Sequence, residues 1–262
     1  MKKTLTAILC GAAVLIIAAF FLGKTVSTST LAPLPAGELA DGVRGTDYGI
    51  DKNINEATID NYLGRSDTVY RFMLMLEDTA TWENKGGTRN ITGFIEGFEV
   101  VPYPYLTEFP DAYRAQKEAE NIHNLYVGET LFSLDEDGNY IANYEESMAI
   151  LESLFPKDKN IILMCGAGGY ANFTKKMLVA LGWDESKIYN AGGYWNYEGN
   201  HNVEVEYQNS LGETEYAFWK VAYHDIDFSR LTKLTTVSLK DEDIDAEPAE
   251  IATEIVNTSV GF

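Results

Sequence analysis

Cysteine, histidine and positive charge are the scarce features of this 262-residue chain. The two cysteines, Cys10 and Cys165, exclude a disulfide framework. The three histidines, His123, His201 and His224, have no metal-ligand spacing, so we predict no metal site. The 20 lysines and arginines face 40 aspartates and glutamates, which gives a net charge of −20. Nucleic acid binding needs a basic surface, so a nucleic acid partner is not expected.

The N-terminal segment, residues 1–24, has the features of a signal sequence or an uncleaved membrane anchor. Two lysines precede the apolar run of residues 5–22, which is near the lower limit for a membrane span and long for a signal peptide. No small-residue cleavage site follows closely, so we favour the anchor. Leu9 stands where a bacterial lipoprotein has a small residue, so lipidation of Cys10 is not expected. The flanking charge predicts a cell-membrane protein with an extracytoplasmic domain, or a secreted protein if the segment is cleaved.

Three further regions follow this segment. Residues 25–45 are rich in proline, glycine and small side chains, which is typical of a linker. Residues 46–235 have the composition of a folded domain. Residues 236–262 begin as an acidic stretch, and we expect this tail to be disordered or loosely docked.

Alternating strand and helix patterns predict an α/β domain with a mostly parallel central sheet. The apolar run 69–76 is the best candidate for a central strand, and residues 48–63 are predicted to be a lead-in that packs on the domain. Residues 77–90 are polar and predict a loop or a short helix. The other predicted strands are residues 94–101, 161–164 and 187–190, and the predicted helices are residues 111–120, 145–155 and 172–181.

Two segments predict antiparallel hairpins. Residues 130–134 and 140–142 flank the acidic stretch 135–138, which we interpret as a solvated turn because its spacing lacks the oxygen ligands of a calcium loop. Residues 203–207 and 216–222 alternate between apolar and polar side chains, and they predict a C-terminal β-hairpin extension.

Cys165 is the strongest candidate for chemistry, because it ends a buried strand and precedes a glycine-rich loop. A helix is predicted to begin after the loop, near Ala171. Backbone N–H groups of such a loop, together with the helix dipole, stabilise an anion and lower the pKa of a thiol. We therefore predict a reactive thiol, with a small buried hydrophobic residue as the alternative. The candidate N–H donors are Gly166, Ala167, Gly168, Gly169, Tyr170 and Ala171.

Three segments resemble the rhodanese-like domain in order and spacing. They are GFIEGFEVVP at residues 93–102, the strand–Cys165–loop–helix unit, and KIYNAGGYWNY at residues 187–197. The resemblance covers residues 67–197 and implies a three-layer sandwich, whose mostly parallel five-stranded sheet is flanked by helices. It also implies that Cys165 is the nucleophile of a sulfurtransferase or persulfide carrier, without a cofactor. The implied partner is a small sulfur donor or acceptor, or a persulfide-carrying protein.

The chain departs from this family at its charged and polar positions. Tyr170 and Ala167 replace the Arg and the Ser or Thr of the loop, residues 72–74 replace an Asp-x-Arg, and Phe94 replaces a His. The lost cations would bind thiosulfate, so we expect a neutral or organic persulfide, or a protein persulfide, as the donor. The alternative function is a catalytically degenerate binding or redox-sensing module. A cysteine phosphatase is disfavoured, since it needs an Arg where this chain has Ala171.

Other side chains are weaker candidates for the same site. Arg65, Arg71 and Arg89 are candidates for a cation supplied from elsewhere in the chain, although a surface position is the simpler interpretation. Four aromatic residues are candidates for an aromatic lining near the loop, with core and rim packing as the simpler interpretation: Trp183, Tyr194, Trp195 and Tyr197.

Overall fold

The computed structural model describes residues 31–74, 93–121, 126–218, 220–234 and 256–259. The chain divides into two compact units, Met1–Pro33 and Leu34–Phe262, and the second unit includes residues 34–45 of the predicted linker. The predicted anchor at 1–24 and the predicted loop at 77–90 lie outside the described residues. Within the described ranges, no helix is long and apolar enough to cross a membrane.

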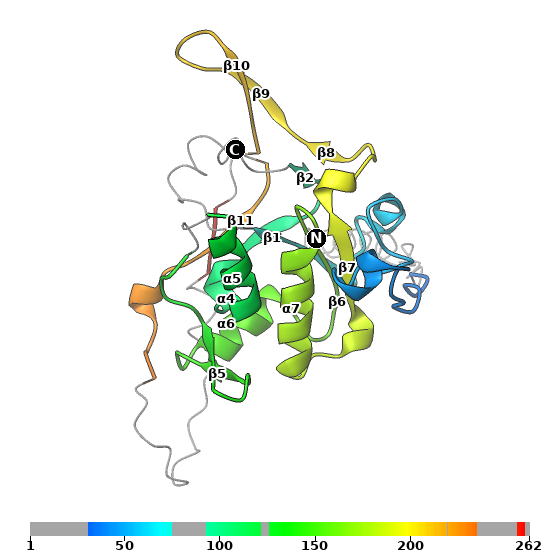
Figure 1. Cartoon of the computed structure of the whole chain (residues 1–262). Coiled ribbons are helices and arrows are strands. Elements are labelled where there is room, and N and C mark those ends of the chain that lie inside the picture. The colour runs from blue at the N-terminus through cyan, green and yellow to red at the C-terminus, as the bar shows by residue number, and fades with distance from the viewer. Residues whose placement is uncertain (1–30, 75–92, 122–125, 219, 235–255, 260–262) are drawn as a thin grey trace, which may run out of the picture. The chain divides into compact units, whose positions relative to one another are not determined.

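A six-stranded sheet forms the centre of the second unit, in the order β12-β11-β3-β1-β6-β7 (Figure 1). Strands β11, β3, β1, β6 and β7 are parallel to one another, which confirms the α/β prediction. Strand β12 is antiparallel to β11. The predicted central strand is β1, which lies between β3 and β6. The bounds are β1 (Thr68–Leu74), β3 (Glu99–Pro102), β6 (Asn160–Cys165), β7 (Ile188–Gly193), β11 (Tyr223–Ile226) and β12 (Val256–Ser259).

The remaining elements are helices and three small antiparallel pairs, β2–β8, β4–β5 and β9–β10. The α-helices are α2 (Val43–Thr46), α4 (Tyr103–Leu106), α5 (Asp111–Ala119), α6 (Ser147–Leu154) and α7 (Gly169–Ala180). The 3₁₀ helices are η1 (Ile59–Tyr62), η2 (Glu185–Lys187), η3 (Tyr194–Asn196) and η4 (Phe228–Arg230). The paired strands are β2 (Phe94–Ile95), β4 (Phe132–Leu134), β5 (Tyr140–Ala142), β8 (Asn202–Val203), β9 (Val205–Gln208) and β10 (Thr214–Ala217).

The single strand predicted over residues 94–101 is wrong, because the segment forms two strands. Gly97, at φ 87°, separates β2 from β3, and β2 leaves the main sheet to pair with β8. A left-handed backbone turn is cheap at glycine, which lets the chain change sheets within a few residues.

Side chains alternate between the two faces of β6 and so define two apolar cores. Leu163 and Cys165 lie on the face covered by α4, α6 and α7, which contribute Leu106, Leu151 and Met177 among others. Figure 1 shows these helices together on one side of the strands. The helix-covered face therefore holds the cysteine.

The opposite face of the sheet is covered mainly by non-α segments. Ile54 and Ile59 of the N-terminal stretch are fully buried against it, which confirms that this stretch packs on the domain. Phe94 and Ile95 of β2 complete this second core with Phe72 of β1. In the part of the chain that the structure describes, the α-helices that enter a core therefore lie on one face.

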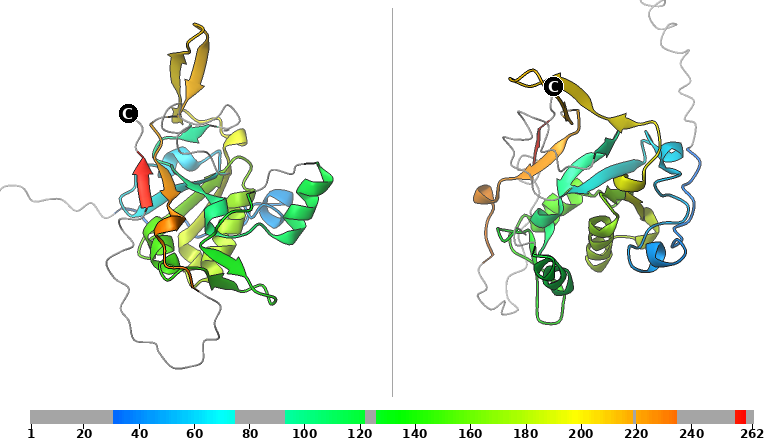
Figure 2. Two further views of the ribbon diagram at one scale, coloured as in Figure 1. Left: turned by 90° about the vertical axis from the view of Figure 1, so that its left-hand side faces the viewer. Right: turned by 45° about the horizontal axis from the view of Figure 1, so that its top comes forward.

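The C-terminal third adds two structures to the sheet. Strands β9 and β10 pair in antiparallel register and project away from the main sheet (Figure 1). Strand β11 then returns beside β3, and Val256–Ser259, within the predicted tail, forms β12 against it. Figure 2 shows β12 in red next to β11 in orange.

Candidate active site

Cys165 is the last residue of β6, at the carboxyl end of a strand that lies between β1 and β7. The ladder to β7 is irregular at this point, because Leu163 pairs with Asn190 whereas Cys165 pairs with Gly193. The extra residue in β7 makes a bulge, and Gly192 takes φ 85° within it. A Cβ atom on Gly192 would lie 2.3 Å from Glu56 Oε1. Both the backbone angle and the space therefore require glycine beside the cysteine.

The loop after Cys165 turns its backbone toward the sulfur. The N–H of Gly168 donates a hydrogen bond to Cys165 Sγ at 2.9 Å. Gly168 has φ 105° and immediately precedes α7, which begins two residues earlier than predicted. This conformation is available to glycine at little cost, so the loop sequence sets the N–H direction. In this geometry the Gly168 N–H points at the sulfur of Cys165.

Burial nevertheless raises the pKa of the Cys165 thiol above its ordinary value, and only 3% of the residue is exposed. The N–H groups of Ala171, Gly168, Ala167 and Tyr170 act in the opposite direction, but they do not overcome the loss of water. The expectation of a lowered thiol pKa is therefore wrong for this conformation. Loop geometry can be predicted from glycine spacing, whereas desolvation depends on what covers the loop.

The bulge and the loop are held together by two buried polar side chains. Asn190 donates from Nδ2 to the Gly168 carbonyl at 3.1 Å and to the Tyr48 carbonyl at 2.7 Å, and its Oδ1 accepts from Gly192 N–H. Glu56 Oε1 accepts from Gly193 N–H at 3.0 Å and forms an ion pair with Arg44. The N-terminal stretch thus fixes the strand that faces Cys165, a role that sequence reasoning missed.

Tyr170, which stands at the family's Arg position, belongs to an aromatic cluster on the helix face. Its ring stacks on Tyr103 at 5.5 Å and lies 5.6 Å from Phe109. Its hydroxyl lies 3.0 Å from that of Tyr113. We call Tyr103, Phe109, Tyr113, Tyr170 and Phe173 the aromatic cluster.

The aromatic cluster and the thiol belong to one apolar region. Cys165, Tyr103 and Phe109 share the helix-face core, and Tyr170 packs against that core. Burial, followed by the hydrogen bond with Tyr113 and charge interactions that include Cys165, raises the pKa of Tyr170. A neutral hydrogen-bonded phenol therefore occupies the place where the resemblance implies a cation.

Tyr170 was among the predicted site residues as a backbone N–H donor, whereas the other members of the aromatic cluster were not. The sequence feature that indicates the cluster is the Tyr-Pro-Tyr run directly after β3. The carboxyl ends of parallel strands meet at one edge of a sheet, so this run is expected at the same edge as the end of β6.

The arginines considered as replacement cations have other partners. Arg65 pairs with Asp67 at 2.8 Å. Arg71 is buried, where its Nη1 lies 2.8 Å from Glu99 Oε2 and its Nε donates to the Leu154 carbonyl. Arg89 lies outside the described residues. Among the described residues, the influences on the thiol pKa are burial and the backbone N–H groups of the loop.

Two of the departures from the family lie in direct contact. Phe72 and Phe94, which replace polar positions, have ring centroids 4.6 Å apart, and both are fully buried. An edge-to-face aromatic pair of this kind stabilises an apolar core. Both rings belong to the core on the face of the sheet opposite Cys165.

The four aromatic candidates from the sequence have different positions. Trp183 is core, and its Nε1 donates to the Phe155 carbonyl at 2.6 Å. Trp195 is 69% exposed, and its backbone N–H donates to the carbonyl of Gly166 in the loop. Tyr194 and Tyr197 pack against each other beside it. Only the Trp195 segment borders the cysteine loop through a hydrogen bond.

Histidines and acidic groups do not assemble a metal site in the described ranges. His224 Nε2 lies 2.8 Å from Glu99 Oε2, and the exposed His201 lies 3.6 Å from Glu96. His123 lies outside the described residues. Comparison of the chain with protein-family models, curated proteins and solved structures found no match.

Proposed function

We propose that the protein is a rhodanese-like persulfide carrier or sulfurtransferase in which Cys165 accepts sulfane sulfur and passes it on. The observation that carries the proposal is the Gly168 N–H at 2.9 Å from Cys165 Sγ, at the start of the 12-residue helix α7. N–H groups aimed at a sulfur, with a helix dipole behind them, stabilise negative charge there. The fold supports the same proposal, because five parallel strands place the cysteine at their carboxyl edge.

The transfer step begins when the Cys165 thiol gives its proton to solvent. The thiolate then attacks the outer sulfur of a donor persulfide. A new sulfur–sulfur bond forms on Cys165, the donor's own sulfur–sulfur bond breaks, and the donor leaves as a thiolate with the electron pair. The new terminal sulfur carries the negative charge, which the loop N–H groups stabilise. Gly166, Ala167 and Gly169 are partly exposed, so the loop is the side from which a donor would approach.

An organic or protein persulfide suits this site better than thiosulfate. Neutral aromatic side chains surround Tyr170, and the groups that favour the Cys165 thiolate are backbone N–H groups rather than cations. A doubly charged donor would lose its hydration there without a counter-charge.

Mass spectrometry of Cys165 tests the proposal directly. The full chain is incubated with glutathione persulfide or with thiosulfate, and we expect one added sulfur atom on Cys165 with the persulfide. The Cys165→Ser variant should show no adduct. Absence of an adduct with every donor would overturn the proposal.

Gly168→Ala tests the role of the loop N–H. A Cβ at this position would meet Ile50 Cδ1 at 3.3 Å and would sit on a positive φ of 105°, so the N–H should move away from the sulfur. We expect at least about tenfold slower persulfidation. Gly64→Ala is the matched control, because Gly64 also has a positive φ, 71°, and has open space around its Cβ position. Equal rates in the two variants would argue against a role for the loop.

The second candidate function is a rhodanese-like module without turnover, which binds a partner or senses oxidants. Burial of the thiol is the observation that favours the absence of turnover, since a raised pKa keeps the sulfur protonated and weakly nucleophilic at neutral pH. Reversible oxidation of Cys165 by hydrogen peroxide without transfer from any persulfide would favour this function over the first.

A further inference from the structure

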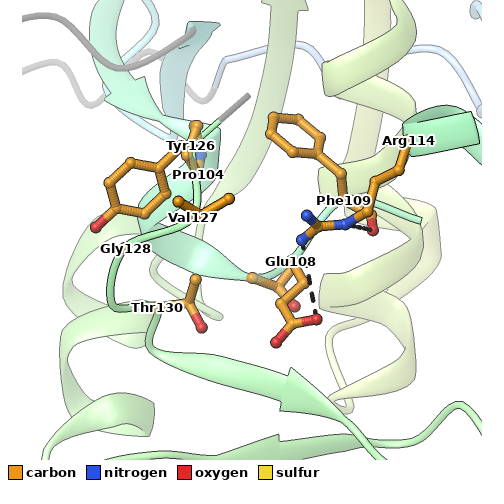
Figure 3. A pocket seen from close by; sticks show the side chains of 9 residues that line it. Pro104, Glu108, Phe109, Arg114, Tyr126, Val127, Gly128 and Thr130 are labelled. Carbon is orange, nitrogen blue, oxygen red and sulfur yellow. Dashed lines mark hydrogen bonds and ion pairs between the residues drawn. The ribbon is translucent and has the colours of Figure 1, made fainter. Parts of the chain in front are cut away.

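A second candidate site is lined in part by Phe109, whose ring also packs against Tyr170. It is a pocket of about 130 Å³, formed where the segment after α4 and the start of α5 face residues 126–130 (Figure 3). A cavity of about 150 Å³ holds a benzene molecule, so this pocket suits a ligand with about six or seven non-hydrogen atoms. The residues that line it are Pro104, Thr107, Glu108, Phe109, Arg114, Tyr126, Val127, Gly128 and Thr130.

The pocket carries one positive and one negative side chain at its border. Arg114 Nη2 and Glu108 Oε2 are 3.9 Å apart, which is too long for a hydrogen bond. Arg114 is oriented by its Nε, which donates to the Phe109 carbonyl at 3.0 Å. Within the described ranges its two Nη groups donate no hydrogen bond, and Nη2 forms the ion pair with Glu108 that Figure 3 marks with a dashed line. The loose pair leaves both charges available to a ligand.

The rest of the lining mixes apolar and polar residues, and it includes one buried hydroxyl without a hydrogen-bond partner among the described residues. Pro104, Phe109 and Val127 give it apolar walls. Thr107 is 1% exposed, and its Oγ1 has no hydrogen-bond partner in the described part of the chain. An unpaired buried hydroxyl is costly, and a polar atom at the base of the pocket could pair with it.

We propose that this pocket binds a small zwitterionic α-amino acid. The carboxylate pairs with the Arg114 guanidinium, whose planar pair of N–H groups matches a carboxylate. The ammonium group pairs with Glu108, and a short apolar side chain lies against Phe109 and Val127. A ligand with only a carboxylate would pair with Arg114 and leave Glu108 without a partner. A ligand with only an ammonium group would pair with Glu108 and leave Arg114 without a partner. The two charges form an ion pair without a hydrogen bond, so a ligand that carries both charges gains a hydrogen-bonded partner for each of its groups.

Titration calorimetry of the full chain with three matched compounds tests this site. The probes are L-2-aminobutyrate, butyrate, which lacks the ammonium group, and propylamine, which lacks the carboxylate. We expect L-2-aminobutyrate to bind with a Kd below about 1 mM, and the other two at least about tenfold more weakly.

Variants assign the binding to the two charges. Arg114→Gln should weaken L-2-aminobutyrate binding at least about tenfold, whereas Arg230→Gln, an exposed arginine outside the pocket, should leave it unchanged. Glu108→Gln should remove the preference for L-2-aminobutyrate over butyrate; because Glu108 is half exposed, this variant is expected to fold. Absence of binding, equal binding of butyrate, or an unchanged preference in Glu108→Gln would each overturn the proposal.

This site is independent of sulfur chemistry at Cys165. The Cys165→Ser variant should bind L-2-aminobutyrate as the unaltered chain does, since Cys165 does not line the pocket. Failure of persulfidation would therefore leave this proposal standing, and failure of amino acid binding would leave the persulfide proposal standing.

Discussion

Two opposing effects act on the pKa of the Cys165 thiol. The loop N–H groups stabilise the thiolate, and burial under the helix face stabilises the neutral thiol. The first influence follows from glycines in the sequence, and it was predictable. The second follows from Tyr103, Phe109 and their neighbours, which come from other parts of the chain. Sequence reasoning identified the residue and its loop but not the ionisation state that its surroundings favour.

Alkylation of Cys165 should therefore require alkaline pH. In a Cys10→Ser variant, which leaves one thiol, we expect the iodoacetamide rate to reach half its maximum above the ordinary thiol pKa of about 8.5. The same chain unfolded in urea is the control, and its midpoint should lie near that ordinary value. Since the folded pKa is raised, this thiol stabilises the fold at low pH, and the contribution is lost as pH rises through 8.5 and beyond. A folded midpoint at or below the unfolded one would contradict this account.

At the scale of elements, a partly buried charge cluster links three strands of the sheet. Glu99 of β3 contacts both Arg71 of β1 and His224 of β11 at 2.8 Å. The hydrogen bond with His224, and then the charge of Arg71, hold the pKa of Glu99 below its ordinary value. The alternation and order of elements in the sequence predicted parallel strands. They could not predict this cluster, because strand order brings together residues far apart in the chain.

Glu99→Gln should destabilise the fold at neutral pH. Arg71 is nine-tenths buried and would lose its counter-charge, while the partial exposure of Glu99 reduces the effect, so we expect a loss of roughly 1–3 kcal/mol in the free energy of unfolding. Urea unfolding monitored by circular dichroism measures it. A lowered Glu99 pKa stabilises the fold above the ordinary value, and this contribution is lost as pH falls, so the difference between the two proteins should shrink below about pH 4.

The matched control for this cluster is Glu152→Gln. Glu152 forms a surface ion pair with Lys157 at 2.6 Å, with both side chains well exposed, and its loss should cost little. Equal effects of the two substitutions, or a difference that grows as the solution is acidified, would show that Glu99 does not hold the strands together.

At the scale of the whole molecule, the regular strands could be predicted from the sequence, whereas the irregular segments that cover the sheet could be predicted only in part. The parallel sheet, the central strand β1 and the cysteine at the end of β6 follow from runs of apolar residues and one glycine-rich loop. The covering of the second face by Ile54, Ile59 and β2 was only partly foreseen, since it depends on irregular segments that have no period. The conformation of such segments depends on the apolar surface that they cover, and that surface exists only once the sheet has formed.

The N-terminal segment gives a prediction for the intact chain in cells. If residues 1–24 are an uncleaved anchor, as their apolar run indicates, the full-length protein should stay with membranes in high salt and at alkaline pH, and detergent should release it. Immunoblotting of membrane fractions measures this, and a chain beginning at residue 25 is the control. Release of the full-length protein by salt alone would contradict the anchor.

Cys165 is the sole cysteine of the compact unit that begins at Leu34. A sulfur or oxygen atom added to it therefore meets no second thiol in the same unit to displace it. Regeneration by a thiol must then use a group from outside this unit, and in the Cys10→Ser variant its rate should rise in proportion to the concentration of an external thiol. The lifetime of the modified state is then set by the surroundings of the protein rather than by its own structure, and scarcity of partner thiols would leave the molecule loaded.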